Sequence, residues 1–387
     1  MDFLNNVRVI DFSSFLPGPY CTLTLAELGA EVIHVERPGV GEMGRAFTPG
    51  LFWTVSRNKK SVTIDIKSAA GQEICRKLIA TADVVVEGYR PGVMARVGLD
   101  YASLKDEFPR LIYCSISGFG QYGPDAMVSG HDINYLALAG GLSMTSEPGR
   151  DPTRTAIPVG DLSSASFATT SIMAALYRRV STGRGEYIDV AITDSILAWM
   201  SMRWGEFLRD GKVLAPHERP DLSPANRIYR CSDGKRISIG AVEDKFWQNL
   251  VRALDRPDLA AEPRYRHNPS RVEHYAELSP ILEQIFLSRT RAEWIVVLKE
   301  NDVPYAPALE VDEIPDYPQH VARGMFRTLR NPAGADYRQV PFPVKFANTV
   351  TDDGFPLRDL GADTDAVLAG VGYGEAARAA LRQDGVI

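Results

Sequence analysis

The strongest constraint on the fold is an alternation of short apolar runs with helix-like stretches along the first third of the chain. Strand-like runs occupy residues 7–12, 31–35, 62–66, 84–87 and 111–117. Helix-like stretches follow the first of these runs at residues 20–29 and the third at residues 69–80. Strands that alternate with helices are joined by crossover connections, so the pattern predicts a parallel sheet with helices on both faces. Such sheets bind ligands beyond the carboxyl ends of their strands, which directs the search for chemistry to the loops that follow them.

The middle of the chain changes character. An Ala-rich helix is predicted at residues 163–178, followed by a strand at 187–190 and an apolar helix at 191–208. Residues 216–224 hold three prolines and several charges and are typical of a linker. Beyond them, a strand at 236–240 and two helices, at 245–253 and 279–286, predict a smaller second domain.

Composition and charge exclude several classes of protein. The chain of 387 residues has 43 Lys and Arg against 49 Asp and Glu, for a formal net charge of −6, which argues against nonspecific binding to nucleic acids or membrane surfaces. Its four cysteines are widely spaced and predict neither a disulfide framework nor a zinc site. The first residues lack the basic and apolar regions of a signal peptide, and no apolar stretch approaches 18 residues. We therefore expect a cytoplasmic protein.

Two glycine patterns resemble the dinucleotide-binding fingerprint G-x-G-x-x-G. They lie at Gly39, Gly41 and Gly44 and at Gly118, Gly120 and Gly123. The fingerprint needs a helix that starts at once and turns its amide dipole towards a pyrophosphate, and neither sequence continues in that way. A phosphate-binding loop of nucleoside triphosphatases and the G-x-S-x-G motif of serine hydrolases are both absent.

Two residues are candidates for acid–base chemistry. His131 follows the glycine-rich loop after a predicted strand, where an imidazole can act near neutral pH, although a lone histidine can also serve only a structural hydrogen bond. Asp161 directly precedes a long apolar helix. It could be an N-cap, a functional carboxylate or both, because a helix N-terminus stabilises an ionised carboxylate.

Basic residues gather near the predicted strands. They are Arg57, Lys59, Lys60, Lys67, Arg90 and Arg96. Scattered surface cations are the simplest explanation, but their positions after or between strands also predict the docking of an anionic ligand. Given the acidic total charge, a small polyphosphate ligand fits better than nucleic acid.

At this point the sequence resembles the family III CoA-transferase superfamily (CaiB/BaiF), and most of all its α-methylacyl-CoA racemase branch. The motifs that carry the resemblance are AELGAEVI (26–33), ERPG (36–39), RNKKS (57–61), DIK (65–67), EGYRPGV (87–93), SGFGQYGP (117–124) and GRGEYIDV (183–190). The similarity is strong from about residue 5 to 250 and weaker from there to the end.

The resemblance implies an α/β fold with a large Rossmann-like domain, a smaller α+β domain and an interlocked homodimer. The large domain would comprise residues 1–210 and 330–387, and the small domain residues 211–329. Coenzyme A, as part of an acyl-CoA substrate, would be the only cofactor, with no metal, membrane or nucleic acid involved. The positions that match CoA-contacting segments are Arg37, Ile64, Lys67, Gly88, Tyr89, Arg90 and Arg96. Arginine and lysine suit the phosphates of that ligand.

The resemblance leaves the reaction open between two chemistries. The racemases remove and return a proton at the carbon next to the thioester, and their base pair matches His131 and Asp161, within the motif GHDINY (130–135). Asp132 and Glu243 match the supporting carboxylates of that branch. The transferases instead use an aspartate as nucleophile, and Asp161 occupies that position too. A third alternative is an acyl-CoA-binding protein without catalysis.

Two departures bear on this choice. Many transferases carry a glutamine shortly before the Gly-Pro of the first loop. This chain has FLPGP (15–19) there, with no amide side chain, which favours the racemase. The run that follows Asp161, residues 162–166, lacks the glycines often seen in racemases. The sequence therefore predicts racemisation of a 2-methylacyl-CoA through His131 and Asp161, with CoA transfer through Asp161 as the alternative.

Overall fold

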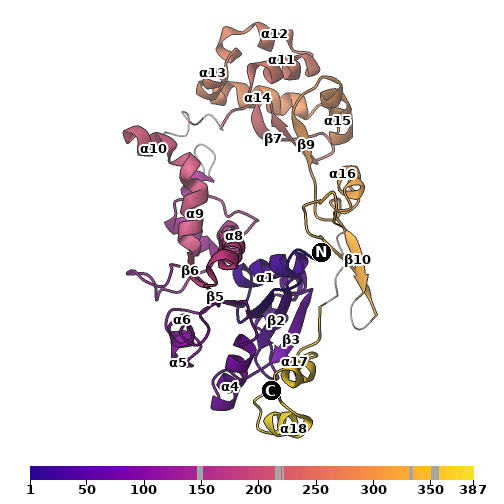
Figure 1. Cartoon of the computed structure of the whole chain (residues 1–387). Coiled ribbons are helices and arrows are strands. Elements are labelled where there is room, and N and C mark those ends of the chain that lie inside the picture. Colours follow the sequence, from indigo (N-terminus) through magenta and orange to yellow (C-terminus); the bar gives the residue numbers. More distant parts are fainter. Residues whose placement is uncertain (146–150, 214–218, 220–221, 331–333, 350–356) are drawn as a thin grey trace. The chain divides into compact units, whose positions relative to one another are not determined.

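The computed structural model describes residues 1–145, 151–213, 219, 222–330, 334–349 and 357–387. These fall into two compact units (Figure 1). The larger unit takes its residues from 1–145, 154–201 and 324–387, and the smaller unit from 151–153 and 202–323. Among the described residues, no helix is long and apolar enough to cross a membrane.

The larger unit is built on a six-stranded parallel sheet with the strand order β3-β2-β1-β4-β5-β6. The strands are β1 (Arg8–Asp11), β2 (Glu31–Glu36), β3 (Lys59–Thr63), β4 (Val84–Glu87), β5 (Ile112–Ser117) and β6 (Glu186–Ala191). The predicted α/β class and parallel sheet are confirmed. The chain adds β2 and β3 on one side of β1, and β4, β5 and β6 on the other. The direction of winding therefore reverses between β1 and β4, the place where sheets of this kind bind ligands.

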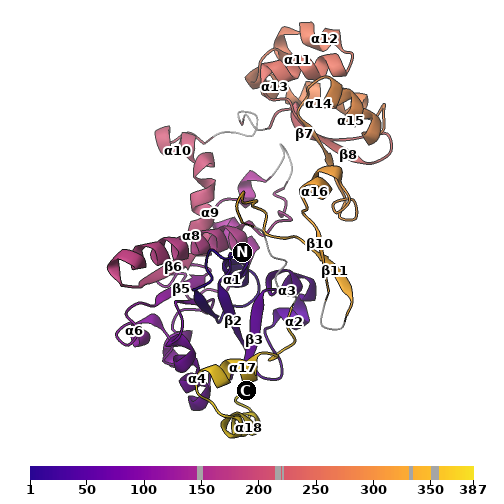
Figure 2. The same ribbon diagram turned by 45° about the vertical axis from the view of Figure 1, so that its right-hand side comes forward.

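Helices cover both faces of this sheet (Figures 1 and 2). Those of the larger unit are α1 (Pro17–Glu27), α2 (Gly44–Phe47), α3 (Pro49–Val55), α4 (Ala69–Ile79), α5 (Val93–Arg96), α6 (Tyr101–Leu104), α7 (Asp132–Leu138), α8 (Val159–Thr182), α9 (Ile192–Met200), α17 (Thr364–Gly370) and α18 (Glu375–Gln383). A two-stranded antiparallel sheet, β10 (Arg327–Arg330) and β11 (Asp336–Gln339), belongs to the same unit.

Alternate strand residues feed two separate cores. Val9 packs on one side of the sheet with residues of α1, α7, α8 and α9. Its neighbour Ile10 packs on the other side with α4, α5, α6, α17 and the C-terminal residue Ile387. Since successive side chains of a strand point to opposite faces, near-continuous apolar runs are what a sheet buried on both faces requires.

Several element boundaries differ from the sequence-based prediction. The helix predicted at 163–178 begins at Val159 and ends at Thr182, and the helix predicted at 279–286 begins at Tyr275. The first helix begins at Pro17, not at residue 20, since proline is well suited to the first position of a helix. The third strand runs from Lys59 to Thr63, where the prediction was 62–66, and it pairs with β2 over its whole length. The predicted helix 191–208 is interrupted, because α9 ends at Met200 and α10 (Gly205–Asp210) starts after a short 3-10 turn.

The smaller unit combines a three-stranded antiparallel sheet, in the order β7-β8-β9, with a set of short helices. Its strands are β7 (Asn226–Arg230), β8 (Arg236–Gly240) and β9 (Tyr305–Ala308), and its helices are α10, α11 (Asp244–Ala253), α12 (Pro257–Ala261), α13 (Asn268–Glu273), α14 (Tyr275–Phe286), α15 (Arg291–Glu300) and α16 (Pro318–Ala322). Trp247, Phe286 and Trp294 lie at the centre of its core. Much of the predicted linker 216–224 lies outside the described residues.

Candidate active site at the N-terminus of α8

The carboxyl edge of the parallel sheet is where the candidate residues gather. Helix α8 ends at Thr182, immediately before β6 begins at Glu186, so α8 runs antiparallel to the strands and starts at their carboxyl edge. Helix α1 follows β1 and also starts at that edge, and it packs against α8 (Figure 2). The first turns of α1 and α8 therefore lie on the same side of the molecule as the loops after β1, β4 and β5.

Asp161 is the third residue of α8, not the residue before it, and is partly buried. The residue before the helix, Pro158, has no side chain that could cap it. A residue of α7 supplies the cap instead: the Asp132 carboxylate oxygen Oδ1 accepts the backbone N–H groups of Gly160, at 2.7 Å, and Asp161, at 3.3 Å. A carboxylate in this place satisfies amides that have no partner within the helix and interacts favourably with its dipole.

The close approach of α7 to α8 depends on glycine at position 160. A Cβ atom there would lie 2.9 Å from side-chain atoms of Ile192 and Ile196 and 3.0 Å from Asp132 Oδ1. Contacts this short would force the three elements apart. Gly160 therefore lets the carboxylate of Asp132 reach the start of α8.

The turn that carries His131 is fixed on both sides. His131 precedes α7 in an extended conformation, and its backbone N–H donates to the Asn134 side-chain carbonyl at 3.0 Å. Its neighbour Asp132 binds the start of α8, so the turn lies next to the helix end that bears Asp161. The His131 side chain is exposed. The turn that bears the exposed His131 side chain therefore lies next to the helix N-terminus that bears the partly buried Asp161.

The environment of Asp161 changes its acidity. Burial, and in addition the negative charge of Asp132, raise the pKa of Asp161 to about 7. Both effects disfavour the ionised form, and the N–H groups that would offset them are taken by Asp132. A carboxyl group that titrates near neutral pH can both accept and return a proton, which is the property required of a general acid–base group.

Tyr135 is a site residue that the sequence analysis did not identify. Its hydroxyl donates to the Gly130 carbonyl oxygen at 2.6 Å, next to His131. A Cβ atom on Gly118 would lie 2.5 Å from its ring, and one on Gly130 2.6 Å. Burial and the charge of Asp161 raise the pKa of this tyrosine. The signal in the sequence was the two glycines, of which Gly118 was interpreted as part of a dinucleotide-binding pattern and not as space for an aromatic ring.

Arg90 connects the predicted CoA segment with the His131 turn. Its guanidinium Nη2 donates to the Ser129 hydroxyl at 2.7 Å. Arg90 belongs to the loop after β4, and Ser129 lies two residues before His131. The loop with the predicted CoA-contacting residues and the loop with the predicted base therefore meet at the carboxyl edge.

The other predicted CoA-contacting residues lie in the loops after β2, β3 and β4, strands of the same sheet with β1 between β2 and β4. Arg37 follows β2, Ile64 and Lys67 follow β3, and Gly88 and Tyr89 follow β4, with Arg96 at the end of α5. Of these, the cationic side chains are exposed and Ile64 is buried. Loops after β2, β3 and β4 share one edge of the sheet, which is consistent with an extended ligand along it.

The expectation that Arg57, Lys59 and Lys60 meet an anionic ligand is wrong. All three precede or begin β3, and each has a carboxylate partner in the chain. Lys59 is buried and its ammonium donates to Asp11 Oδ2 at 3.2 Å, while the buried Arg57 pairs with Glu27 at 2.8 Å. Lys60 pairs with Glu31. These cations stabilise the fold and have carboxylate partners within the chain.

Glu243 belongs to the smaller unit, where it precedes α11. Its side chain is exposed and does not cap that helix. His131, Asp132 and Asp161 belong to the larger unit, and the supporting role of Glu243 stays a prediction.

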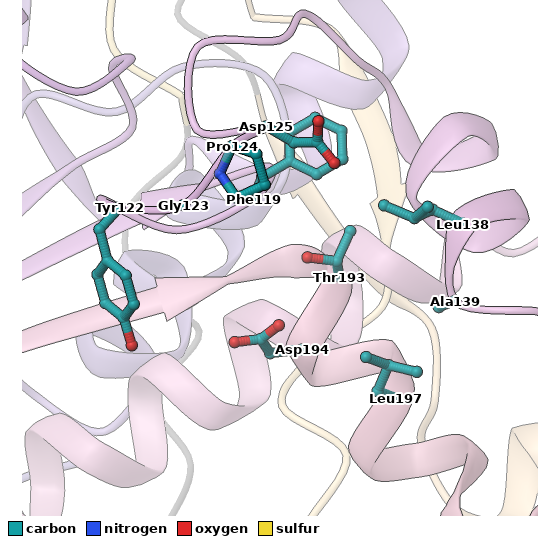
Figure 3. A pocket seen from close by; sticks show the side chains of 10 residues that line it. All are labelled: Phe119, Tyr122, Gly123, Pro124, Asp125, Leu138, Ala139, Thr193, Asp194 and Leu197. Atoms are coloured by element: carbon teal, nitrogen blue, oxygen red, sulfur yellow. The ribbon is translucent and has the colours of Figure 1, made fainter.

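Two cavities of the larger unit lie beside this site but contain neither His131 nor Asp161. One cavity, of about 190 Å³, is lined by Phe119, Thr193, Asp194 and residues of the loop 122–125. Leu138 and Leu197 line it on the side opposite Tyr122 (Figure 3). The second, of about 260 Å³, is lined by Glu87, Tyr113, Tyr187 and others.

Glu87 also escaped the sequence analysis. Burial raises its pKa to about 7, although the Ser115 hydroxyl and the Tyr89 N–H stabilise its charged form. The signal that could have found it is an acidic residue at the end of an apolar strand. Within the described ranges, no group of three or more His, Cys, Asp or Glu side chains is arranged to hold a metal ion.

Comparison with known proteins identifies the family. Residues 4–364 match the sequence profile of CoA-transferase family III. The chain belongs to this family. Its resemblance to the CaiB/BaiF proteins, stated above from short motifs, is thereby confirmed.

Relatives in this family carry both names that the sequence analysis considered. The chain is 36% identical to a succinyl-CoA–D-citramalate CoA-transferase of Chloroflexus aurantiacus over 85% of this chain and 84% of that protein. It is 30% identical to the human alpha-methylacyl-CoA racemase over 99% of this chain and 97% of that protein. A crystal structure of a CaiB/BaiF family protein from Brucella suis superposes with a TM-score of 0.85 at 30% identity, covering 95% and 98% of the two chains. Family membership alone therefore leaves both reactions open.

Proposed function

We propose that this member of CoA-transferase family III moves a proton at the α-carbon of a 2-methylacyl-CoA thioester, with His131 and Asp161 as the two bases. The observation that carries the proposal is the bond of Asp132 to the amides of Gly160 and Asp161, which holds the His131 turn at the start of α8. Asp161, with a pKa of about 7, can accept and return a proton near neutral pH, and the turn that carries His131 lies next to it.

The reaction is balanced between these two groups. One base takes the α-proton, the electron pair of the C–H bond passes into a thioester enolate, and the other base, already protonated, delivers its proton to the opposite face. The first amides of α8 bind Asp132, so they are not free to stabilise the enolate oxygen. Other amides at the carboxyl edge would have to do so.

Proton NMR in deuterium oxide tests the proposal, using each enantiomer of a 2-methylacyl-CoA separately. The native enzyme should replace the α-proton of both enantiomers by deuterium. His131→Ala should lose exchange with one enantiomer and Asp161→Asn with the other, because each base serves one face. Ser143→Ala, an exposed substitution just beyond α7, is the matched control. Full exchange and racemisation by His131→Ala would overturn the two-base reading.

CoA transfer is the second candidate, and the 36% identity to a CoA-transferase favours it. In that reaction an oxygen of Asp161 bonds to the acyl carbon while the C–S bond breaks and CoA leaves as a thiolate, giving an anhydride. Absence of α-exchange together with CoA transfer to succinate or oxalate, with Asp161 trapped by hydroxylamine, would establish this alternative. CoA binding without either reaction would indicate a binding protein. The interlocked homodimer stays a prediction under each outcome.

A further inference from the structure

The turn between β1 and α1 contains an aromatic residue in a backbone conformation that aromatic residues rarely adopt. Phe15 has φ = +66°. The other non-glycine residues with positive φ among those described are Asn58, Asp255 and Asp302, residue types that tolerate the left-handed region. A bulky side chain does not, so this conformation persists only where its surroundings enforce it.

The carboxylate of Glu42 provides the enforcing contact. Its Oε1 accepts the Phe15 N–H at 2.9 Å and the Gly44 N–H at 2.9 Å. Glu42 is only 6% exposed, and its own N–H donates to Glu36 Oε2 at 3.1 Å. Glu36 is held in turn by Arg45 at 2.6 Å. The turn after β1 is thus tied to the segment after β2 through one buried side chain.

A second set of buried polar groups holds the beginning of the same turn. Asp11 accepts the Ser13 N–H at 2.9 Å, and the His34 imidazole contacts the Ser13 carbonyl oxygen at 3.2 Å. Lys59 donates to the Pro19 carbonyl oxygen at 2.8 Å, within the first turn of α1. Burying charged groups is costly, and proteins keep such unfavourable arrangements mostly at functional sites.

The position of this turn relates it to the ligand. It follows β1, at the point where the winding of the sheet reverses. A Cβ atom on Gly88, in the predicted CoA segment, would lie 3.6 Å from the Ser13 Cβ, so the two loops are in contact. The Phe15 ring is 39% exposed. Helix α1 then starts beside α8, whose first turn bears Asp161.

We propose that Glu42 is a positioning residue, which holds the β1–α1 turn in its strained form so that bound acyl-CoA meets a preformed surface. This inference rests on the proposed function. It assigns to Glu42 no contact with the substrate, since the other carboxylate oxygen, Oε2, is shielded from solvent and has no hydrogen-bond partner among the described residues.

The test compares Glu42→Ala and Glu42→Gln in the native chain and in Phe15→Gly, with free CoA as the probe in isothermal titration. Glu42→Ala should raise the Kd for CoA by about tenfold, because small misplacements of positioning groups are costly. Glu42→Gln keeps an oxygen for both amides and should stay within about threefold of native. Glycine adopts positive φ without strain, so adding Glu42→Ala to Phe15→Gly should change Kd by less than about threefold.

Each outcome has a distinct meaning. An unchanged Kd in Glu42→Ala, or the same loss in both backgrounds, overturns the positioning role while leaving the proposed function intact. If the native protein binds no CoA, the proposed function fails and the inference fails with it. Should Glu42→Ala not fold, Glu42→Asp replaces it, since the shorter carboxylate cannot reach both amides.

Discussion

The Asp132 carboxylate accepts the backbone N–H of Asp161 at 3.3 Å, and its negative charge raises the pKa of the Asp161 carboxyl group. One side chain thus fixes the position of the candidate base and also adjusts its acidity. The two effects separate on substitution, because an amide oxygen can accept the same N–H groups without carrying a charge.

Asp132→Asn should lower the pKa of Asp161 from about 7, because it removes the nearby like charge. The pKa should stay above its ordinary value, because burial, the larger cause, remains. The limb on which kcat/KM rises with pH should move to lower pH. The pH dependence of α-proton exchange measures this shift. Asp125→Asn, an exposed position on the preceding loop, should leave the limb in place. A limb that does not move in Asp132→Asn would show that Asp161 is not the group being titrated.

Asp161→Asn should abolish racemisation and stabilise the fold at alkaline pH. The folded-state pKa of Asp161, about 7, lies above the ordinary aspartate pKa of 3.8, so the native protein binds this proton more tightly than the unfolded chain. Stability relative to the asparagine variant is therefore lost as pH rises from about 4 through 7. At about 1.4 kcal/mol per pKa unit, the variant gains on the order of 2–4 kcal/mol between pH 4 and pH 8.

Urea unfolding of both proteins at pH 4 and pH 8 measures this gain. Equal differences in the free energy of unfolding at the two pH values would contradict the raised pKa. Ser164→Ala, whose hydroxyl donates within the same helix to the Asp161 carbonyl oxygen, controls for effects that do not depend on pH.

The parallel sheet was predictable because its strands are near-continuous apolar runs, and so was the gathering of His131 and Asp161 at one edge. What the sequence could not reveal are pairings between distant residues. Lys59 lies in a run of basic residues that resembles a surface cluster, yet its partner Asp11 stands 48 positions away in an apolar strand. Likewise nothing local indicates that Asp132 caps α8 and not its own helix. Contacts of this kind depend on tertiary packing, which periodicity does not encode.

Lys59→Met tests the buried pair. Its ammonium and the Asp11 carboxylate are both withdrawn from solvent, with side-chain exposures of 1% and 0%. Removing one member of a buried pair leaves the other charge uncompensated, so the free energy of unfolding should fall by about 3–5 kcal/mol. Lys60→Met is the matched control: its pair with Glu31 is partly exposed and should contribute less than about 1 kcal/mol. If urea unfolding gives similar losses of unfolding free energy for the two variants, the buried Lys59 pair contributes no more to stability than the partly exposed Lys60 pair.

Tyr135→Phe separates positioning from stability at the His131 turn. The substitution keeps the ring that fills the space beside Gly118 and Gly130 but removes the hydrogen bond to the Gly130 carbonyl oxygen. The fold should lose only about 1 kcal/mol, the usual net value of such a bond. Exchange of the substrate α-proton should fall about tenfold, because His131 directly follows Gly130 and small misplacements of a base are costly. The Kd for free CoA should not change. Tyr177→Phe, at a ring that is 84% exposed, is the control. A loss of stability without a loss of exchange would limit Tyr135 to a role in packing, and a changed Kd would place it in the CoA site.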